Sequence, residues 1–400
     1  MFKHYLVGGA VAVSLFPALA AGQTDFNPEV SLILQGAWID RAGGERHITG
    51  FLPAGGHGHG HGDGDGEATR GFTLDHTELV MSANVDRYFR GYLNLALIDE
   101  EAEVEEAWFQ TLGLGHGLSV KGGRFLSGIG YQNELHPHAW NFADNNLMYQ
   151  ALFGTHLIQD GLQAKWVAPL DTFLEFGVEA ARGQNFPGTD TDKRGVGTWA
   201  AFAHVGDDVG TSHSWRAGLS HVRARPDHRD GELEDRWDEE VELEFSGTSR
   251  AWIADFVWKW APDGNPTQQN LTLQAEYFRR TERGEMDCEK GSCDGEEGDY
   301  RARQSGWYAQ SVYQFMPRWR VGYRYDRLQS NSVDFGDLEP WVTGSDYKPS
   351  KHTVMVDYSP SEFSRLRLQF ARDKSMEDAA DNQVILQYIF SLGAHGAHRF

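Results

Sequence analysis

The residues best suited to bind a metal ion lie in a glycine-rich tract, GGHGHGHGDGDGE, from Gly55 to Glu67. Neutral imidazoles and carboxylates are ligands for zinc, nickel or copper. Glycine at every second position makes the tract flexible, so ordering it around an ion costs conformational entropy and lowers the affinity. The alternative is a solvated low-complexity loop. The sequence therefore predicts weak zinc binding here, with no cofactor required. The candidate ligands are His57, His59, His61, Asp63 and Asp65.

A second set of polar residues lies in the segment from Gly122 to Gly154, GGRFLSGIGYQNELHPHAWNFADNNLMYQALFG. It lacks alternation of polar and apolar residues, yet it is rich in aromatic and apolar ones. A loop of this length in a compact fold is usually functional or disordered. We expect it to pack inside a barrel and to form a constriction, because clustered charged groups at a narrow point set selectivity. The alternative is that it only stiffens the barrel, with its polar groups satisfied internally. The expected constriction residues are Arg124, Tyr131, Glu134, His136, His138, Asp144 and Asn145.

A third set consists of arginines on stretches that alternate with apolar and aromatic residues, so that the arginines share one face. A guanidinium cluster facing acidic groups across a pore would create a field that guides anions. The alternative is pairing with interior acidic residues, which would only stabilise the wall. The predicted lumen arginines are Arg318, Arg320, Arg324, Arg365 and Arg367. Their acidic partners would be Glu175, Glu179, Asp326 and Asp357.

The composition and charge of the chain indicate which class of protein carries these residues and which classes do not fit. The formal charge of −22 argues against nucleic acid, whose phosphates such a surface would repel. The chain contains 46 glycines, 13 tryptophans and 14 tyrosines, and its mean hydropathy is negative. This mixture is typical of a transmembrane β-barrel, in which a polar lumen face averages out the apolar lipid face. Serines and histidines such as Ser214 and His221 show no triad spacing, so we expect no enzyme.

The N-terminus indicates export. Lys3 and His4 precede an apolar run, and Ala18-Leu19-Ala20 fits a signal-peptide cleavage site. We therefore expect residues 1–20 to be a signal peptide and residues 21–400 to form one barrel domain. The two cysteines, Cys288 and Cys293, are expected to form a disulfide in this exported chain, the alternative being a free or metal-binding pair.

Alternating stretches recur along the rest of the chain and predict about sixteen strands, within the range of bacterial outer-membrane barrels. Short connectors are expected near Asp86, Gly115, Pro169, Gly206, Gly264, Pro317 and Pro360. Long polar connectors are expected at 41–71, 126–157, 183–194, 224–248, 282–300, 329–350 and 372–381. Strict alternation of short and long connectors is typical of a barrel with periplasmic turns and extracellular loops, and a soluble sandwich has no physical reason to keep it.

The motifs GRFLSGIGY (Gly123 to Tyr131) and HPHAWNFAD (His136 to Asp144) resemble those of a proteobacterial outer-membrane family. Its members are described as porin-like, as related to phosphate-selective porins, or as zinc-regulated receptors of the TonB-dependent class. Phe400 in phase with the last strand resembles the assembly signal of outer-membrane proteins. The general porins have a similar plan, in which the third long loop folds into the lumen.

The resemblance implies an all-β, antiparallel outer-membrane barrel of a Gram-negative bacterium that acts as a channel for small solutes or ions, with a link to zinc or other divalent metals. The implied partners are outer-membrane lipid, lipopolysaccharide and the barrel assembly machinery, and the analogy with porins suggests a homotrimer. Two alternatives stay open: a plugless TonB-dependent-receptor-like zinc uptake protein, and a barrel for surface adhesion or recognition.

Overall fold

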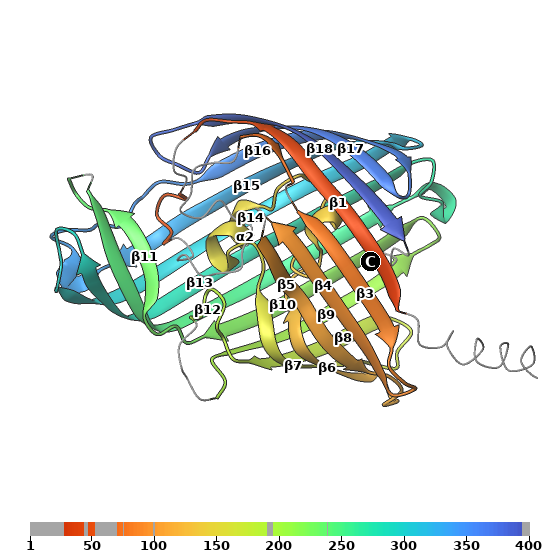
Figure 1. Ribbon diagram of the computed structural model, residues 1–400, viewed down its shortest axis with the longest axis horizontal. Coiled ribbons are helices and arrows are strands. Elements are labelled where there is room, and N and C mark those ends of the chain that lie inside the picture. Colours follow the sequence, from red (N-terminus) through yellow and green to blue (C-terminus); the bar gives the residue numbers. More distant parts are fainter. Residues whose placement is uncertain are drawn as a thin grey trace, which may run out of the picture.

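The chain folds as a closed, all-antiparallel β-barrel in the computed structural model (Figure 1). The structure describes residues 28–43, 47–52, 70–74, 76–98, 101–189, 195–237 and 239–393. The expected signal peptide, the tract from Gly55 to Glu67 and Phe400 lie outside the described residues.

Eighteen strand segments in the described residues form one sheet. They are β1 (Glu29–Asp40), β2 (Gly71–Thr73), β3 (Thr77–Asn84), β4 (Phe89–Ile98), β5 (Glu101–Thr111), β6 (Leu118–Leu126), β7 (Ile158–Val167), β8 (Phe173–Ala181), β9 (Thr198–Val209), β10 (His213–Ala224), β11 (Arg229–Glu234), β12 (Glu240–Trp260), β13 (Asn270–Lys290), β14 (Glu297–Met316), β15 (Trp319–Asp334), β16 (Ser350–Ser361), β17 (Ser364–Lys374) and β18 (Asp381–Gly393). β2 and β3 both pair with β1, and β10 and β11 both pair with β12, so these segments fill sixteen wall positions, as predicted. The barrel closes where β1 pairs with β18 (Figure 1).

Alternate residues of the wall face opposite environments. On β17, Leu366, Leu368 and Phe370 are exposed on the outer face, whereas Arg367 and Gln369 are buried inside. Exposed apolar side chains recur on most strands of the barrel, which gives the outer face a band suited to lipid. The band and the closed sheet assign the chain to the bacterial outer membrane.

The connectors differ in length between the two ends of the barrel. One end has short turns, for example residues 85–88, 112–117, 317–318 and 362–363. The other end has the longer connectors, which include residues 127–157 and 335–349. By this difference we call the first end periplasmic and the second extracellular.

Three of the predicted connectors are wrong in position. The loops predicted at 224–248 and 282–300 are largely strand, because β12 begins at Glu240 and only residues 291–296 separate β13 from β14. These strand ends extend beyond the apolar band. They still alternate, as in Glu240-Val241-Glu242-Leu243, but their outward side chains are charged rather than apolar, so the segments were predicted as polar loops. The turn predicted at Gly206 lies at residues 210–212, because Gly206 still pairs with Arg216 in the wall.

The longest described connector, residues 127–157, lies inside the barrel, and we call it the lumenal loop (Figure 1). It contains the 3-10 turn η2 (Pro137–Ala139) and the helix α2 (Leu147–Phe153). The side chain of Asn146 caps the start of α2, and Gly154 ends it in a left-handed conformation. No helix within the described ranges is long and apolar enough to cross a membrane.

The lumenal loop and the wall share an apolar core inside the barrel. Met148, Tyr149 and Phe153 of α2 belong to one buried cluster with Ile253 of β12 and Phe278 of β13. β12 is therefore apolar on both faces: Trp252 is 51% exposed outside, whereas Ile253 is 0% exposed inside. Burial of the apolar side chains of α2 against the wall stabilises the loop in its lumenal position.

Candidate functional site in the barrel lumen

Two buried wall carboxylates hold the first half of the lumenal loop. Glu276 of β13 accepts hydrogen bonds from the backbone amides of Tyr131 and Gln132, the latter at 2.8 Å. Glu179 of β8 accepts from the Ser127 hydroxyl at 2.6 Å and from the Gly128 amide at 2.8 Å. An irregular loop needs partners for its buried backbone groups, and here inward side chains of the wall supply them.

Two inward arginines, on β15 and β17, hold the second half of the loop. Arg324 of β15 donates to the Asp144 carbonyl at 2.8 Å and to its carboxylate at 3.0 Å. Arg367 of β17 donates to the Trp140 carbonyl at 2.8 Å and forms an ion pair with Asp357 at 2.9 Å. The same Asp357 carboxylate pairs with Arg320. The lumenal loop is thereby tied to both sides of the barrel.

Asp144 is the most strongly bound carboxylate of the loop. Its oxygens lie 2.7 Å from the Lys351 ammonium and 3.0 Å from the Arg324 guanidinium. Burial alone would raise the pKa of Asp144, but these two cations outweigh it and hold the pKa well below its usual range. Asp144 is therefore charged at neutral pH and acts as an anchor of the loop.

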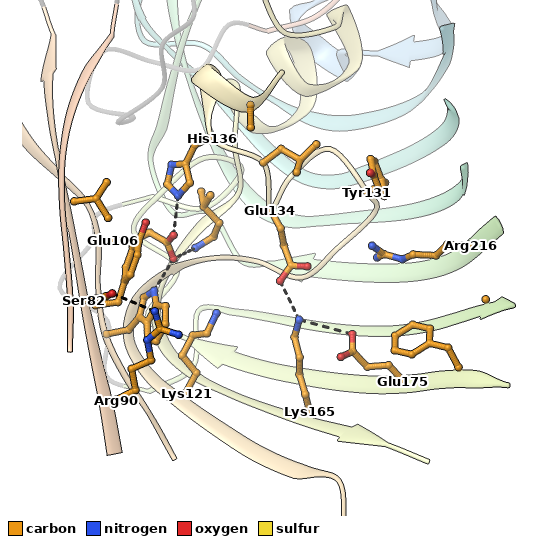
Figure 2. Close-up of a pocket in the computed structure, with 18 of the residues that line it drawn as sticks. Ser82, Arg90, Glu106, Lys121, Tyr131, Glu134, His136, Lys165, Glu175 and Arg216 are labelled. Carbon is orange, nitrogen blue, oxygen red and sulfur yellow. Dashed lines mark hydrogen bonds and ion pairs between the residues drawn. The ribbon is translucent and has the colours of Figure 1, made fainter. Parts of the chain in front are cut away.

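A cavity of about 750 Å³ opens on the periplasmic side of the lumenal loop. Figure 2 shows Lys165 of β7 between Glu134 of the loop and Glu175 of β8. The Lys165 ammonium lies 2.9 Å from the Glu134 carboxylate and 3.7 Å from the Glu175 carboxylate. Arg216 of β10 donates to the Gly130 carbonyl and lies over the ring of Tyr131. Charged side chains of both signs thus line the space next to the loop.

The structure brings together four of the seven expected constriction residues. Tyr131, Glu134, His136 and His138 all line the cavity. Asn145 is 2% exposed and donates to the Thr155 carbonyl, so it orders the loop itself. Asp144 also lies away from the cavity lining, at the arginines described above.

Two predicted lumen residues point elsewhere. Arg124 is still part of strand β6, opposite Asp160 of β7, with which it forms an ion pair at 2.7 Å. It shares its face with Leu162, which is 57% exposed to the outside, so the prediction that Arg124 lines the constriction is wrong. Arg318 is exposed in the turn between β14 and β15, with a positive φ of 72°, so it does not face the lumen either. Arg124 was predicted inside because the segment from Gly122 was interpreted as part of the loop, and Arg318 because it was placed on the strand that begins at Trp319.

The remaining predicted arginines do face inward. They pair with acidic residues of the wall, which is the alternative considered above to a cluster that guides anions. Arg320 and Arg367 pair with Asp357, and Arg365 lies 4.0 Å from the same residue. Arg324 lies 3.1 Å from Asp326. On the other side of the barrel, away from these arginines, Glu175 pairs with Lys165 and Glu179 accepts a hydrogen bond from the Gly128 amide of the loop.

Sequence reasoning missed the basic residues of the cavity. Lys121, Lys165 and Arg216 line it, together with Glu106 and Glu175. Each stands at an inward position of its strand, so the alternation could have identified them once the strand register was known. The two cysteines lie far from this site, where Cys288 and Cys293 form a disulfide in the extracellular hairpin between β13 and β14.

Comparisons with known proteins agree with this architecture. No family model matches the sequence. An uncharacterized protein of Aquifex aeolicus (strain VF5) is 32% identical over 411 residues, covering 98% of this chain and 83% of that protein.

Three solved structures are similar in fold. The outer membrane channel DcaP of Acinetobacter baumannii has a TM-score of 0.56 at 12% identity and covers 92% of this chain and 98% of its own. OprB of Pseudomonas putida has a TM-score of 0.53 at 12% identity, with 94% and 97% covered. An anion-selective porin from Comamonas acidovorans has a TM-score of 0.51 at 10% identity, with 92% and 99% covered. At such low identity these similarities concern the barrel fold.

Proposed function

The chain belongs to the family of the uncharacterized Aquifex aeolicus protein and is an outer-membrane β-barrel, and from this premise we propose that it is a porin-like channel for small hydrophilic solutes or ions. The observation that carries the proposal is the lumenal loop, which is tied to both walls and forms one side of a charged cavity. A fixed loop of this kind narrows a water-filled barrel, and the charges beside it set which solutes pass.

The charges of the cavity favour cations in this proposal. Among the described residues, seven carboxylates line it against four lysines and arginines. The acidic residues are Glu29, Glu106, Glu134, Asp171, Glu175, Asp207 and Asp208. The basic residues are Arg90, Lys121, Lys165 and Arg216. A surplus of one sign in a confined space raises the local concentration of the opposite ion.

The test is electrical recording from the purified protein in planar lipid bilayers. We expect ohmic channels with a reversal potential in a KCl gradient that indicates a preference for K⁺. Lys165→Ala removes a cavity cation and is expected to increase that preference, whereas Arg318→Ala, in a turn outside the lumen, serves as the matched control. Protein that inserts without conductance would refute the channel, and an unchanged reversal potential for Lys165→Ala would refute the role of the cavity charges.

The inward arginines contribute less to selectivity in this account. Arg320 and Arg365 lie beside the Asp357 carboxylate and, unlike Lys165, do not line the cavity. We expect the double variant Arg320→Ala with Arg365→Ala to shift the reversal potential less than Lys165→Ala does. A larger shift would assign the main selective field to these arginines and favour anion guidance.

Binding of zinc is a separate part of the proposal. The tract with His57, His59 and His61 lies outside the described residues, and its ligand types alone support weak binding. Titration of zinc into the purified protein should lose its weak phase when the three histidines become alanine. An identical isotherm would reject zinc binding by the tract. A TonB-dependent zinc uptake role would require in addition that uptake stops when the energy-coupling protein is deleted.

Surface recognition is the second candidate function. β12 to β15 continue beyond the apolar band on the extracellular side (Figure 1). There they enclose their own buried cluster, which includes Phe245, Met286 and Tyr300. This ordered extension offers a rigid surface for a partner. An adhesin would bind host or bacterial surfaces and lose binding when the extension is shortened, and it would need no conductance.

The assembly partners complete the proposal. The exposed apolar band supports contact with outer-membrane lipid and lipopolysaccharide, and a barrel of this kind requires the barrel assembly machinery. Removal of residues 1–20 during export would be seen by N-terminal sequencing of the mature protein. Light scattering in detergent distinguishes the homotrimer that we expect from a monomer. We propose no enzymatic activity.

A further inference from the structure

Three segments of the chain bring histidines and glutamates together on the inner face of the wall. β3 and the residue before it, β5 and the lumenal loop each contribute two of them. The ligand atoms of His76, Glu78 and Glu105 all lie within 4.8 Å of one another, and all three residues are buried. The six residues, which we call the His–Glu cluster, are His76, Glu78, Glu105, Glu106, His136 and His138.

We propose that the His–Glu cluster binds one divalent transition-metal ion, best matched by zinc, and that the ion fastens the lumenal loop to β3 and β5. The four ligands are the Nε2 atom of His76, one oxygen each of Glu78 and Glu105, and the Nδ1 atom of His138. This site is distinct from the glycine-rich histidine tract, and it goes beyond the channel function because it would exist whether or not the barrel conducts.

The distances fit a metal better than they fit hydrogen bonds alone. His76 Nε2 lies 3.3 Å from Glu78 Oε1 and 3.3 Å from Glu105 Oε1. Tetrahedral zinc with bonds of about 2.0–2.1 Å separates its ligand atoms by about 3.3–3.4 Å. Hydrogen bonds from nitrogen to oxygen are usually shorter than this, at about 2.9–3.0 Å. His138 Nδ1 lies 2.6 Å from Glu78 Oε1 but outside the group of ligand atoms within 4.8 Å of one another, so it supplies the fourth ligand by moving toward His76 and Glu105.

The orientation of the two carboxylates leaves one oxygen of each for the ion. The Asn94 amide donates to Glu78 Oε2 at 2.8 Å and to Glu105 Oε2 at 3.2 Å. Both Oε1 atoms therefore face His76 on the other side. An amide that orients two ligating carboxylates is a typical outer-shell partner of a metal site. His136 has the same role for Glu105, since its Nδ1 atom lies 3.3 Å from Glu105 Oε2.

Charge balance also favours a divalent ion. Glu78, Glu105 and Glu106 are 0%, 6% and 7% exposed, so three carboxylates share a region with little water. Buried charges require compensation. One M²⁺ ion neutralises the two ligating carboxylates while His76 and His138 stay neutral, which is the form in which histidines bind metals. Glu106 pairs with His136. The alternative is a network of protonated histidines and carboxylates without metal, and the experiment below separates the two.

The ion can reach the site from the periplasmic cavity. His136 and His138 line that cavity, as does Glu106, while His76 and Glu78 lie behind them. Figure 2 shows His136 beside Glu106 at the edge of the cavity. Their Nε2 and Oε1 atoms are 2.9 Å apart. Two ligands from β3 and its preceding residue, one from β5 and one from the loop would make the ion a cross-link between wall and loop.

The test starts from a full-length variant in which His57, His59 and His61 are alanine, so that the tract cannot contribute. After folding in detergent and dialysis against zinc, elemental analysis is expected to find about one zinc ion per chain. His76→Gln should lower the zinc affinity by about 100-fold, and Asn94→Ala by about tenfold, the range seen for outer-shell partners. His204→Gln is the matched control, because His204 pairs with Glu175 on the inner wall outside the cluster.

Cobalt provides a second measurement that does not depend on the variants. Co²⁺ added to the tract-free protein should give the intense visible absorption of a tetrahedral site, and zinc should abolish it. Zinc content near zero together with no cobalt spectrum would overturn the proposal and leave the protonated network. Zinc retained at full affinity by folded His76→Gln protein would overturn the assignment of the ligands. Heat-dependent electrophoretic mobility verifies that each variant is folded.

Discussion

Glu276 is the wall residue whose replacement should release the lumenal loop most directly. Its carboxylate accepts four hydrogen bonds, from the amides of Tyr131 and Gln132 and from the hydroxyls of Tyr149 and Tyr308. Three of the four donors belong to the loop. Glu276→Ala removes every one of these acceptors at once and adds no steric conflict, since the side chain becomes smaller.

The magnitude follows from the donors that cannot turn to another partner. Hydroxyl groups can rotate, but the two backbone amides are fixed by the loop, and a buried donor without an acceptor costs about 1–3 kcal/mol. The two amides together give about 2–6 kcal/mol of lost attachment energy. At about 1.4 kcal/mol for each factor of ten, the equilibrium for loop detachment shifts by about one to four orders of magnitude.

Hydrogen exchange and single-channel recording measure this shift. In Glu276→Ala, amide exchange of residues 127–133 should accelerate, and the channel should show higher conductance with more open-channel noise. Glu276→Gln, which keeps one acceptor oxygen, should lie between the variant and the wild type. Glu282→Ala is the matched control, because Glu282 lies on the same strand but binds Arg229, outside the loop. Unchanged exchange in Glu276→Ala, or equal acceleration in both alanine variants, would refute the reasoning.

Three further predictions concern the wall, the loop anchor and the extracellular hairpin. Leu368→Arg places a charge in the lipid band and should cost about 2–4 kcal/mol of folding free energy in vesicles; equal stability would contradict an outward Leu368. A carboxylate with a lowered pKa stabilises the fold above its unfolded pKa of about 4, and it loses that contribution as the pH falls through its folded pKa. Lys351→Met removes a cation beside Asp144 and lets the pKa of Asp144 rise. The variant should therefore have a lowered melting temperature at about pH 4, where the wild type is unaffected. Replacing Cys288 and Cys293 by serine should destabilise only the hairpin, by about 2 kcal/mol, with faster exchange there and unchanged conductance; a changed conductance would link the hairpin to the pore.

The sequence predicted the barrel because lipid imposes alternation on every wall strand. Only a strand with a different environment on each face requires such a pattern. On β17, for example, apolar and polar residues alternate: Leu366, Leu368 and Phe370 face outward, and Arg367 and Gln369 face inward. The lumenal loop was identified by the absence of this alternation in a segment that is nevertheless rich in apolar residues. In the extracellular parts of β12 and β13, which do not meet lipid, the outward residues are charged rather than apolar, so these strands were predicted as polar loops.

The site was less predictable because its contacts join distant segments. Arg324 and Asp144 are 180 residues apart, and the Trp140 carbonyl that binds Arg367 is 227 residues from it. Periodicity gives the face of a strand but not the partner across the lumen. Arg124 shows that even the direction of a side chain depends on where the strand is taken to end. β6 continues to Leu126, and its alternation turns Arg124 outward. When the segment from Gly122 is interpreted as a loop, this alternation is no longer applied to Arg124.

The most direct test of the account is the conductance of a barrel from which the lumenal loop has been removed. The Ser127 amide donates to the Leu157 carbonyl at 2.9 Å, so a short turn can join these two residues in place of 128–156. If the loop limits the passage, the shortened protein will form channels with a conductance several times that of the wild type and a weaker ion preference. Folded, inserted protein with the wild-type conductance and the same preference would contradict the central claim.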